Sequence, residues 1–219
     1  MEHSKKYKLL LVAFISFSVV FFSQQVNATQ SKICIIRHAK VAIAKPGWGK
    51  TSDAKKYKME YNTSSVITDI PENVQIKIKQ FNDLKSVHCS LLPRSEQTAK
   101  LLFGDSINII ADSRFNELDY PVIDVPLLKL PVKFLLSTSR LLWFLNLNNK
   151  SVDSFKTKKN EIKKLVDDLV KLADEERTIV IVGHGIQMRQ MIKELKKRGW
   201  KPGNLEGYKN LSMNCLVNS

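Results

Sequence analysis

The stretch "ICIIRHAK", residues 33–40, joins a run of apolar, mostly β-branched residues to an arginine and a histidine. A short apolar run bounded by polar residues is typical of a buried strand. The sequence therefore predicts a strand over residues 31–37 that ends by presenting Arg37 and His38. Ligands of α/β sheets bind beyond the carboxyl ends of the strands, so this pair marks a candidate site.

Strand and helix patterns alternate along the rest of the chain. Apolar runs predict strands at residues 86–90, 106–112, 178–183 and 211–217. The spacing of apolar residues, or residues typical of helix ends, predicts helices at 68–84, 94–104, 125–148, 151–176 and 186–199. Thr68 or Asp69 is the expected cap of the first helix, with Pro71 in its first turn. Residues 44–65 have turn signals and are expected to form a long polar loop. The alternation predicts the α/β class, a three-layer α/β/α sandwich with a mostly parallel central sheet.

The first 28 residues have the order of a secretory signal peptide. A basic start precedes fourteen mostly apolar residues, 9–22, and Val26 and Ala28 suit a signal-peptidase site. Fourteen helical residues span only about 21 Å, which is short of a roughly 30 Å hydrocarbon layer. We therefore expect cleavage, a single domain at residues 29–219 and a periplasmic or secreted location. An uncleaved membrane anchor at residues 9–22 is the alternative.

Composition limits the classes of partner. The 219 residues are 43% hydrophobic and 26% charged, which is typical of a globular domain. Residues 1–28 contain three lysines and one glutamate, so their removal lowers the formal charge from +14 to +12. The lysines are spread thinly and do not alternate with aromatics, which favours solvated helix faces over nucleic-acid binding. An anionic membrane surface or a phosphorylated small molecule remains a suitable partner.

The three cysteines, Cys34, Cys89 and Cys215, all lie in apolar, strand-like contexts. An odd number cannot form a complete disulfide framework, so buried thiols are the expected state. A Cys34–Cys89 bridge is open if their strands are neighbours. No spacing typical of metal ligands occurs, and we expect neither a metal nor another cofactor.

Four predicted strands bring candidate site residues to one edge of the sheet. Arg37 and His38 end the first strand, Arg94 follows the second, Glu117 follows the third, and His184 follows the fourth in "IVIVGHG". Each residue alone has an ordinary structural explanation. Their convergence at matching strand ends is much harder to explain without a shared site.

Together these side chains suit phosphoryl transfer. Forked arginine donors bind phosphoryl groups, and a neutral imidazole attacks phosphorus. We expect His38 to be the nucleophile, with Arg37, Arg94 and a protonated His184 binding phosphate and stabilising the charge in the transition state. Glu117 would protonate the leaving oxygen and then activate water.

The same residues resemble the motifs of the histidine phosphatase superfamily, also called phosphoglycerate mutase-like. "RHA" after the first strand, "SLLPRSEQTA" at residues 90–99, "FNEL" around Glu117 and "VGHG" around His184 follow the family order over residues 32–217. The resemblance implies the phosphoglycerate mutase-like fold and a phosphohistidine mechanism. The chain departs from the family pattern after the first histidine: many members have Gly there, with Thr and Asn a few residues on, where this chain has Ala39, Lys40 and Val41. Lys40 is a candidate replacement near the phosphate, and Asp119 is a second candidate acid.

The resemblance and the expected export predict a phosphomonoesterase of an exported branch. A glycolytic mutase or a cytosolic phosphohistidine phosphatase does not fit an exported protein. Family members in envelope compartments resemble acid phosphatases or remove phosphate from the sugars of surface glycolipids. A non-catalytic phosphate-binding module is the alternative, although it would need no nucleophile or acid. Residues 126–147 fall at the family's variable insertion and are expected to form a core helix or, alternatively, a membrane-facing cover carrying Trp143 and Phe144.

Overall fold

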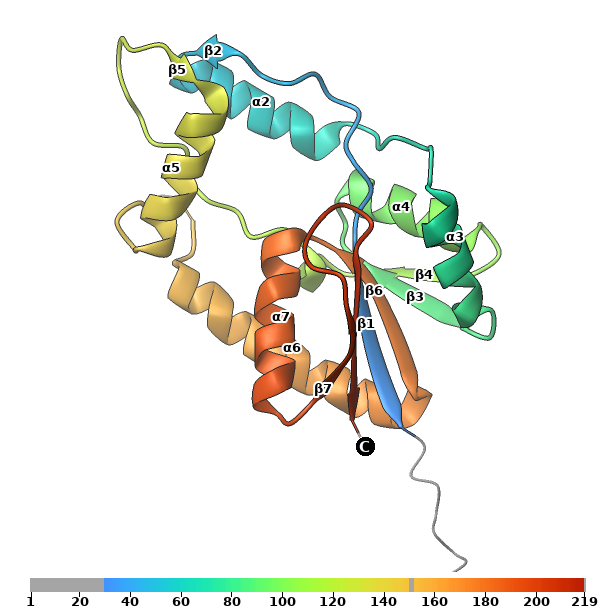
Figure 1. Ribbon diagram of the computed structural model, residues 1–219. Coiled ribbons are helices and arrows are strands. Elements are labelled where there is room, and N and C mark those ends of the chain that lie inside the picture. Colours follow the sequence, from blue (N-terminus) through green and yellow to red (C-terminus); the bar gives the residue numbers. More distant parts are fainter. Residues whose placement is uncertain (1–29, 150–151, 219) are drawn as a thin grey trace, which may run out of the picture. The chain divides into compact units, whose positions relative to one another are not determined.

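A six-stranded sheet forms the centre of the computed structural model, which describes residues 30–149 and 152–218 (Figure 1). The strand order is β4-β3-β6-β1-β8-β7. Strands β4, β3, β6 and β1 run parallel, whereas β8 is antiparallel to both β1 and β7. The strands are β1 Ser31–Arg37, β3 Ser86–Cys89, β4 Asn108–Ala111, β6 Thr178–Gly183, β7 Lys201–Leu205 and β8 Met213–Asn218. The predicted α/β fold with a mostly parallel sheet is confirmed.

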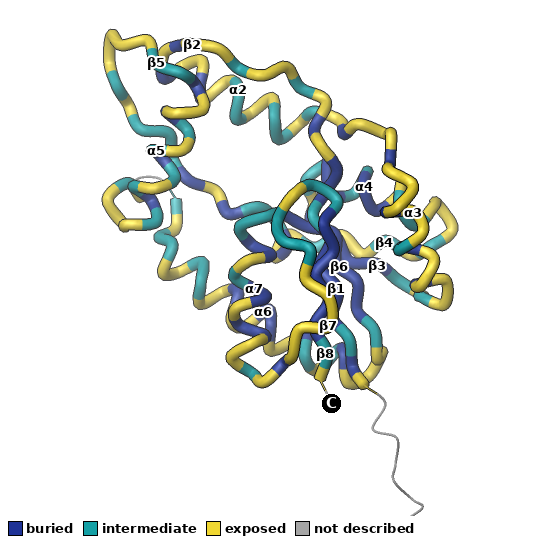
Figure 2. The backbone as a smooth tube through the Cα atoms, viewed as in Figure 1, coloured by how far each residue is buried: buried dark blue, intermediate teal, exposed yellow. Residues whose placement is uncertain are grey.

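Helices cover both faces of this sheet, as Figure 1 shows. Alternate residues of β1 point to opposite faces, so Ile33 and Ile35 join the core beneath α6 and α7, while Cys34 and Ile36 join the core beneath α3 and α4. The helices are α3 Glu72–Ile78, α4 Pro93–Phe103, α6 Phe155–Glu176 and α7 Gly185–Lys197. The darkest, most buried part of the tube in Figure 2 follows β1 and β6.

The prediction of a polar loop over residues 44–65 is wrong. This region contains the short strand β2, Trp48–Gly49, and the helix α2, Thr51–Thr63. The Asp53 side chain accepts a hydrogen bond from the Lys50 N–H and so stabilises the first turn of α2. The fully buried residue through which α2 contacts α5 is a small one, Ala54. The sequence of α2 therefore lacks the regular spacing of large apolar residues from which a helix is predicted.

Strand β2 pairs with β5, Leu130–Pro131, which leads directly into α5, Val132–Phe144. The predicted helix over 125–148 with a break near Pro131 is thus confirmed in shortened form. The predicted helix at 68–84 is also shorter: α3 begins after Pro71, and the 3₁₀ helix η1, Lys79–Phe81, follows it. Neither Thr68 nor Asp69 caps α3. The predicted stop at Gly104 is confirmed, since this residue has a φ of 78°.

A disulfide joins Cys34 of β1 to Cys215 of β8. These residues are direct cross-strand partners in the antiparallel pair β1–β8. Cys89 is a buried free thiol on β3, which pairs with β6 and not with β1. The expectation of three thiols is therefore wrong, as is the Cys34–Cys89 alternative, because β6 separates the two strands.

No helix among the described residues is long and apolar enough to cross a membrane. The predicted signal peptide, residues 1–28, and the apolar run 9–22 lie outside the described residues.

Candidate active site

His38 lies just after β1, at the carboxyl edge of the sheet. Its N–H donates to the carbonyl of Gly183 (2.9 Å), and the residue is only 1% exposed. The Nδ1 atom lies 2.7 Å from the Ala39 carbonyl, which places the proton on Nδ1 and leaves the lone pair on Nε2. Burial, together with the nearby Arg94 and Arg37, lowers the pKa of His38 to about 3. The ring is thus a neutral nucleophile with one free nitrogen.

His184 follows β6, the parallel neighbour of β1, and is the N-cap of α7. The ring centroids of His38 and His184 are 5.2 Å apart. The Ser90 hydroxyl lies 2.7 Å from Nε2 of His184 and fixes the orientation of its ring. Burial and the nearby Arg94 hold the pKa of His184 well below its usual value. This shift favours a neutral ring, which offers one N–H donor, whereas the sequence predicts a protonated His184.

Two arginines flank the histidines. Arg37 donates from Nη1 to the carbonyl of Tyr208, and Arg94, in the first turn of α4, donates from Nη1 to Oδ1 of Asn62 (3.0 Å). The Arg94 guanidinium also lies 5.0 Å from the centroid of the Tyr61 ring. The Nε atoms of both arginines are buried without a hydrogen-bond partner among the described residues. Each guanidinium therefore keeps donor capacity for an anion.

Polar residues of the "SLLPRSEQTA" block hold Arg94 in place. The Ser95 hydroxyl donates to the carbonyl of Val182 in β6 (2.6 Å). The Thr98 hydroxyl accepts from the N–H of Ala39 (2.8 Å) and donates to the carbonyl of Arg94 (2.6 Å). These bonds join α4 both to the strand before His184 and to the loop after His38. The motif spacing thus has a structural explanation beyond the arginine itself.

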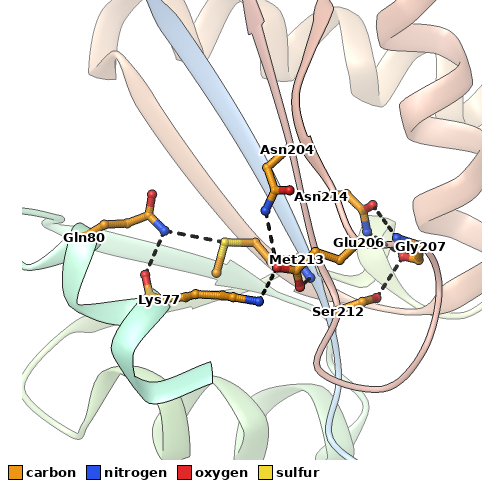
Figure 3. A network of polar contacts seen from close by, with 8 residues as sticks. All are labelled: Lys77, Gln80, Asn204, Glu206, Gly207, Ser212, Met213 and Asn214. Atoms are coloured by element: carbon orange, nitrogen blue, oxygen red, sulfur yellow. Dashed lines mark hydrogen bonds and ion pairs between the residues drawn. The ribbon is translucent and has the colours of Figure 1, made fainter. Parts of the chain in front are cut away.

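The loop between β7 and β8 completes the frame around His38. Its Tyr208 carbonyl accepts from Arg37, and Asn210 Nδ2 donates to the His38 carbonyl (2.8 Å). Figure 3 shows the polar network that holds the base of this loop against α3. Its members are Lys77, Gln80, Asn204, Glu206, Gly207, Ser212, Met213 and Asn214. Sequence reasoning missed this loop because its main contribution is a backbone carbonyl.

Glu117 follows η2, Ser113–Phe115, and lines a pocket of about 510 Å³ together with Arg37 and Arg94. Burial raises the pKa of Glu117, while Arg140 and Arg94 oppose that rise. Asp119, the second candidate acid, is exposed and forms an ion pair with Lys58. Glu117 is therefore the better proton donor of the two.

The pocket also contains residues that the sequence did not single out. They are aromatic or polar side chains from α2 and α5, namely Tyr57, Lys58, Tyr61, Asn62, Lys133, Ser137 and Arg140. Lys40, by contrast, is exposed and does not line the pocket. Neither His38 nor His184 lines the pocket, but the ring of His38 lies 6.4 Å, centroid to centroid, from that of Tyr61, which does. The basic pair Lys133 and Arg140, seven residues apart in an apolar segment, was the available sequence signal.

His88 lies outside the site. It lies in β3 and its ring packs near that of Phe115, with centroids 6.0 Å apart. Within residues 30–149 and 152–218, no group of His, Cys, Asp or Glu side chains has the arrangement of a metal site.

Comparison with known proteins agrees with this geometry. A family model described as "Histidine phosphatase superfamily (branch 1)" matches residues 73–218. The chain belongs to this superfamily and is a phosphatase. The match begins after His38, so it does not cover the candidate nucleophile. No curated protein matches the sequence.

Solved structures show the same fold at low identity. Mycobacterial hydrolase 2 has 16% identity and a TM-score of 0.56, with 86% of this chain and 82% of that chain covered. Mycobacterial glucosyl-3-phosphoglycerate phosphatase has 16% identity and a TM-score of 0.55, with 86% and 90% covered. A histidine-to-alanine mutant of phosphoserine phosphatase from Entamoeba histolytica, in complex with phosphoserine, has 14% identity and a TM-score of 0.51, with 86% and 95% covered.

Proposed function

We propose that this protein is a metal-independent phosphomonoesterase that acts through a phosphohistidine on an extracytoplasmic phosphorylated substrate. The observation that carries the proposal is a neutral, buried His38 with an unprotonated Nε2. Arg94 and Arg37 are near enough to lower its pKa, and each has a buried Nε without a partner among the described residues. An acid with a raised pKa, Glu117, lines the pocket next to them. A nucleophile, an anion clamp and a proton donor are the parts that this reaction requires.

In the first step, Nε2 of His38 attacks phosphorus and the bond from phosphorus to the ester oxygen breaks. Arg37 and Arg94 stabilise the charge on the equatorial oxygens, and His184 adds one N–H. Glu117 donates its proton to the departing oxygen, so the product leaves as a neutral alcohol. The enzyme is left with phosphohistidine at His38 and a carboxylate at Glu117.

In the second step, water attacks the phosphohistidine in line with the His38 nitrogen. The Glu117 carboxylate takes a proton from this water as the new oxygen–phosphorus bond forms. The nitrogen–phosphorus bond breaks, and its electron pair returns to Nε2 of His38. Inorganic phosphate leaves, and both side chains regain their original protonation.

Export and a surface substrate are supported by two observations. Residues 1–28 have the order of a signal peptide, and Cys34–Cys215 is a disulfide of the kind that persists in oxidising compartments. We propose a periplasmic or secreted location, with residues 9–22 as an alternative anchor. We further propose a sugar phosphate or a surface-glycolipid phosphate as the substrate, and an anionic membrane surface as a partner.

Hydrolysis of p-nitrophenyl phosphate in the presence of EDTA tests the activity. We expect turnover by the wild type, and loss of that turnover together with the trapped phosphoenzyme in His38→Ala. His88→Ala is the matched control, because this histidine is also buried at a strand but lies outside the site. It should keep both signals.

A protein that binds phosphate but neither turns over nor traps a phosphoryl group on His38 would be a binding module instead. Turnover that is lost with EDTA and regained with added metal would contradict the proposed mechanism.

A further inference from the structure

Helix α5 is apolar on two opposite sides. Val132, Leu135 and Trp143 are buried, and the Trp143 indole donates to the Asp153 carbonyl (2.9 Å). Trp143 therefore belongs to the core and not to an outer cover. On the other side, Phe134, Leu141 and Leu145 are each more than half exposed. Their spacing of seven and four residues places them along one line of the helix, here called the α5 stripe.

More exposed apolar side chains lie at the start of this helix. Trp48 pairs in register with Pro131, the residue before α5, and is 73% exposed. Leu127 and Leu128 precede β5 and are 93% and 56% exposed. These three residues are called the β5 tip here; Figure 1 shows β2 and β5 together beside the first turn of α5. Large apolar side chains gathered in this way mark an interaction surface.

Positive charges outnumber negative ones around this surface, where Asp53 lies beside Gly49 and Asp124 precedes the β5 tip. The sequence contains no Asp or Glu in residues 31–52 or 125–152, the two segments that supply the α5 stripe and the β5 tip. Lys45, Lys50 and Lys129 stand in or beside the β5 tip and are exposed. Exposed apolar residues flanked mainly by lysines are complementary to an anionic lipid surface, into which the apolar side chains insert while the lysines meet head groups. A tryptophan among them suits the membrane interface.

The same helix connects this surface to the catalytic pocket. Lys133, Ser137 and Arg140 lie on a third side of α5 and line the pocket that contains Glu117. Lys133 and Phe134 are adjacent, as are Arg140 and Leu141, so the α5 stripe and the pocket lining are neighbouring sides of one helix. A head group held at a lipid surface beneath the α5 stripe would therefore meet the pocket at its edge.

We propose that the α5 stripe and the β5 tip dock on the surface of an anionic phospholipid bilayer and deliver phosphomonoester head groups of that surface to the pocket. Docking is independent of the reaction. Its consequence for the substrate rests on the proposed phosphatase function, so the two are tested by separate measurements.

Docking is tested by tryptophan fluorescence of the full chain. Trp48 is exposed, whereas Trp143 and Trp200 are buried, so a quencher in the acyl chains reports on Trp48. Vesicles of brominated phosphatidylcholine and phosphatidylglycerol in equal parts should quench the emission, and brominated phosphatidylcholine alone should quench much less. Added salt should weaken the quenching. Trp48→Phe should remove the quenching and identify its source.

Two triple variants separate the α5 stripe from general surface hydrophobicity. Phe134→Ser, Leu141→Ser and Leu145→Ser together should weaken quenching by the anionic vesicles at least tenfold. The matched control replaces three exposed apolar residues elsewhere, Ile76, Leu101 and Ile110, by Ser and should leave the quenching unchanged. Neither triple touches the pocket lining, so both should hydrolyse p-nitrophenyl phosphate like the wild type.

The second measurement is hydrolysis of phosphatidic acid in the anionic vesicles. The α5-stripe triple variant should hydrolyse phosphatidic acid at least tenfold more slowly than the wild type, while its rate on p-nitrophenyl phosphate stays the same. Docking is overturned if the vesicles do not quench Trp48. It is also overturned if the wild type forms a dimer that the α5-stripe triple variant does not form and that vesicles do not dissociate. Quenching without any hydrolysis of p-nitrophenyl phosphate leaves docking in place and refutes the proposed function.

Discussion

At the scale of single residues, burial acts on the histidines and on the carboxyl group in opposite directions. It lowers the pKa of His38 and raises the pKa of Glu117, because a buried group avoids its charged form. The imidazole therefore stays neutral and nucleophilic while the carboxyl group retains its proton to higher pH. Two groups with pKa values shifted apart in this way can divide the roles of nucleophile and acid.

Replacement of the acid should have an effect that depends on the leaving group. Glu117→Gln removes the proton donor, so kcat/KM for an alkyl phosphate should fall about 100-fold or more. Hydrolysis of p-nitrophenyl phosphate should fall much less, because nitrophenolate leaves without a proton. Steady-state kinetics with both substrates provide the measurement.

Asp119→Asn is the matched control for this substitution, because Asp119 is a carboxylate two residues away that is exposed and paired with Lys58. It should change both rates little. Equal losses on both substrates in Glu117→Gln would contradict the role of Glu117 as general acid.

The buried histidines should also make stability depend on pH. The pKa of His38 is about 3 in the folded chain and about 6.5 in the unfolded chain. Below pH 6.5 the unfolded chain binds a proton that the folded chain does not, so the free energy of unfolding falls with falling pH. The loss is about 1 kcal/mol per pH unit between pH 6 and 4 for this group. Urea unfolding at several pH values should show that the free energy of unfolding depends less steeply on pH in His38→Gln than in the wild type. An equal dependence on pH would contradict a neutral buried His38.

At the scale of elements, the site depends on the parallel pairing of β1 with β6. The register Arg37 with Gly183 places the first residues after both strands side by side, which brings His38 next to His184. Helix α7 begins immediately afterwards at Gly185. A Cβ at Gly185 would lie 3.3 Å from Cζ and Nε of Arg37, so the glycine makes room for the guanidinium.

Gly185→Ala should therefore weaken phosphate binding without weakening the fold. Arg37 is held by the Tyr208 carbonyl and can yield little, so we expect kcat/KM to fall about tenfold, equivalent to about 1.4 kcal/mol. The helix gains alanine, which favours helix by up to about 1 kcal/mol over glycine. Inhibition by inorganic phosphate and thermal unfolding give the two readouts.

Gly183→Ala is the control for this substitution, because the nearest atom to its added Cβ is 4.0 Å away. Its inhibition by phosphate should resemble that of the wild type. If both variants lose phosphate affinity equally, the close approach to Arg37 is not the cause.

At the scale of the whole molecule, the Cys34–Cys215 disulfide joins the first strand of the sheet to the last. It closes a loop across a sequence separation of 181 residues. Restriction of the unfolded chain by such a loop stabilises the fold by about 2–5 kcal/mol. Cys34→Ala with Cys215→Ala should lower the urea midpoint accordingly.

The reductant response distinguishes this bond from general packing. Dithiothreitol should lower the urea midpoint of the wild type and of Cys89→Ala, since the Cys89 thiol is free. It should not affect the double variant. A wild-type midpoint that ignores the reductant under unfolding conditions would contradict a stabilising disulfide.

The catalytic set was predictable from sequence because its signals are local. A buried parallel strand needs a run such as "ICIIR" or "TIVIVG", and the residue after such a run must reach the carboxyl edge of the sheet. Arg37, His38 and His184 follow from that rule, and so do Arg94 and Glu117 in the segments after the second and third strands, where the family motifs also place them. The helix α6 was equally clear, because its apolar residues recur at three- and four-residue steps.

The tertiary structure alone decided everything that depends on which segments meet. It paired Cys34 with Cys215 through the antiparallel register of β1 and β8, placed the Tyr208 carbonyl on Arg37, and folded residues 51–63 into α2 against α5. It also buried the ring of His184, which lowers its pKa, and left one side of α5 exposed. The periodicity of apolar residues along the chain predicts local helices and strands. Burial and backbone contacts arise between segments that are distant in sequence, so only the packed fold determines them.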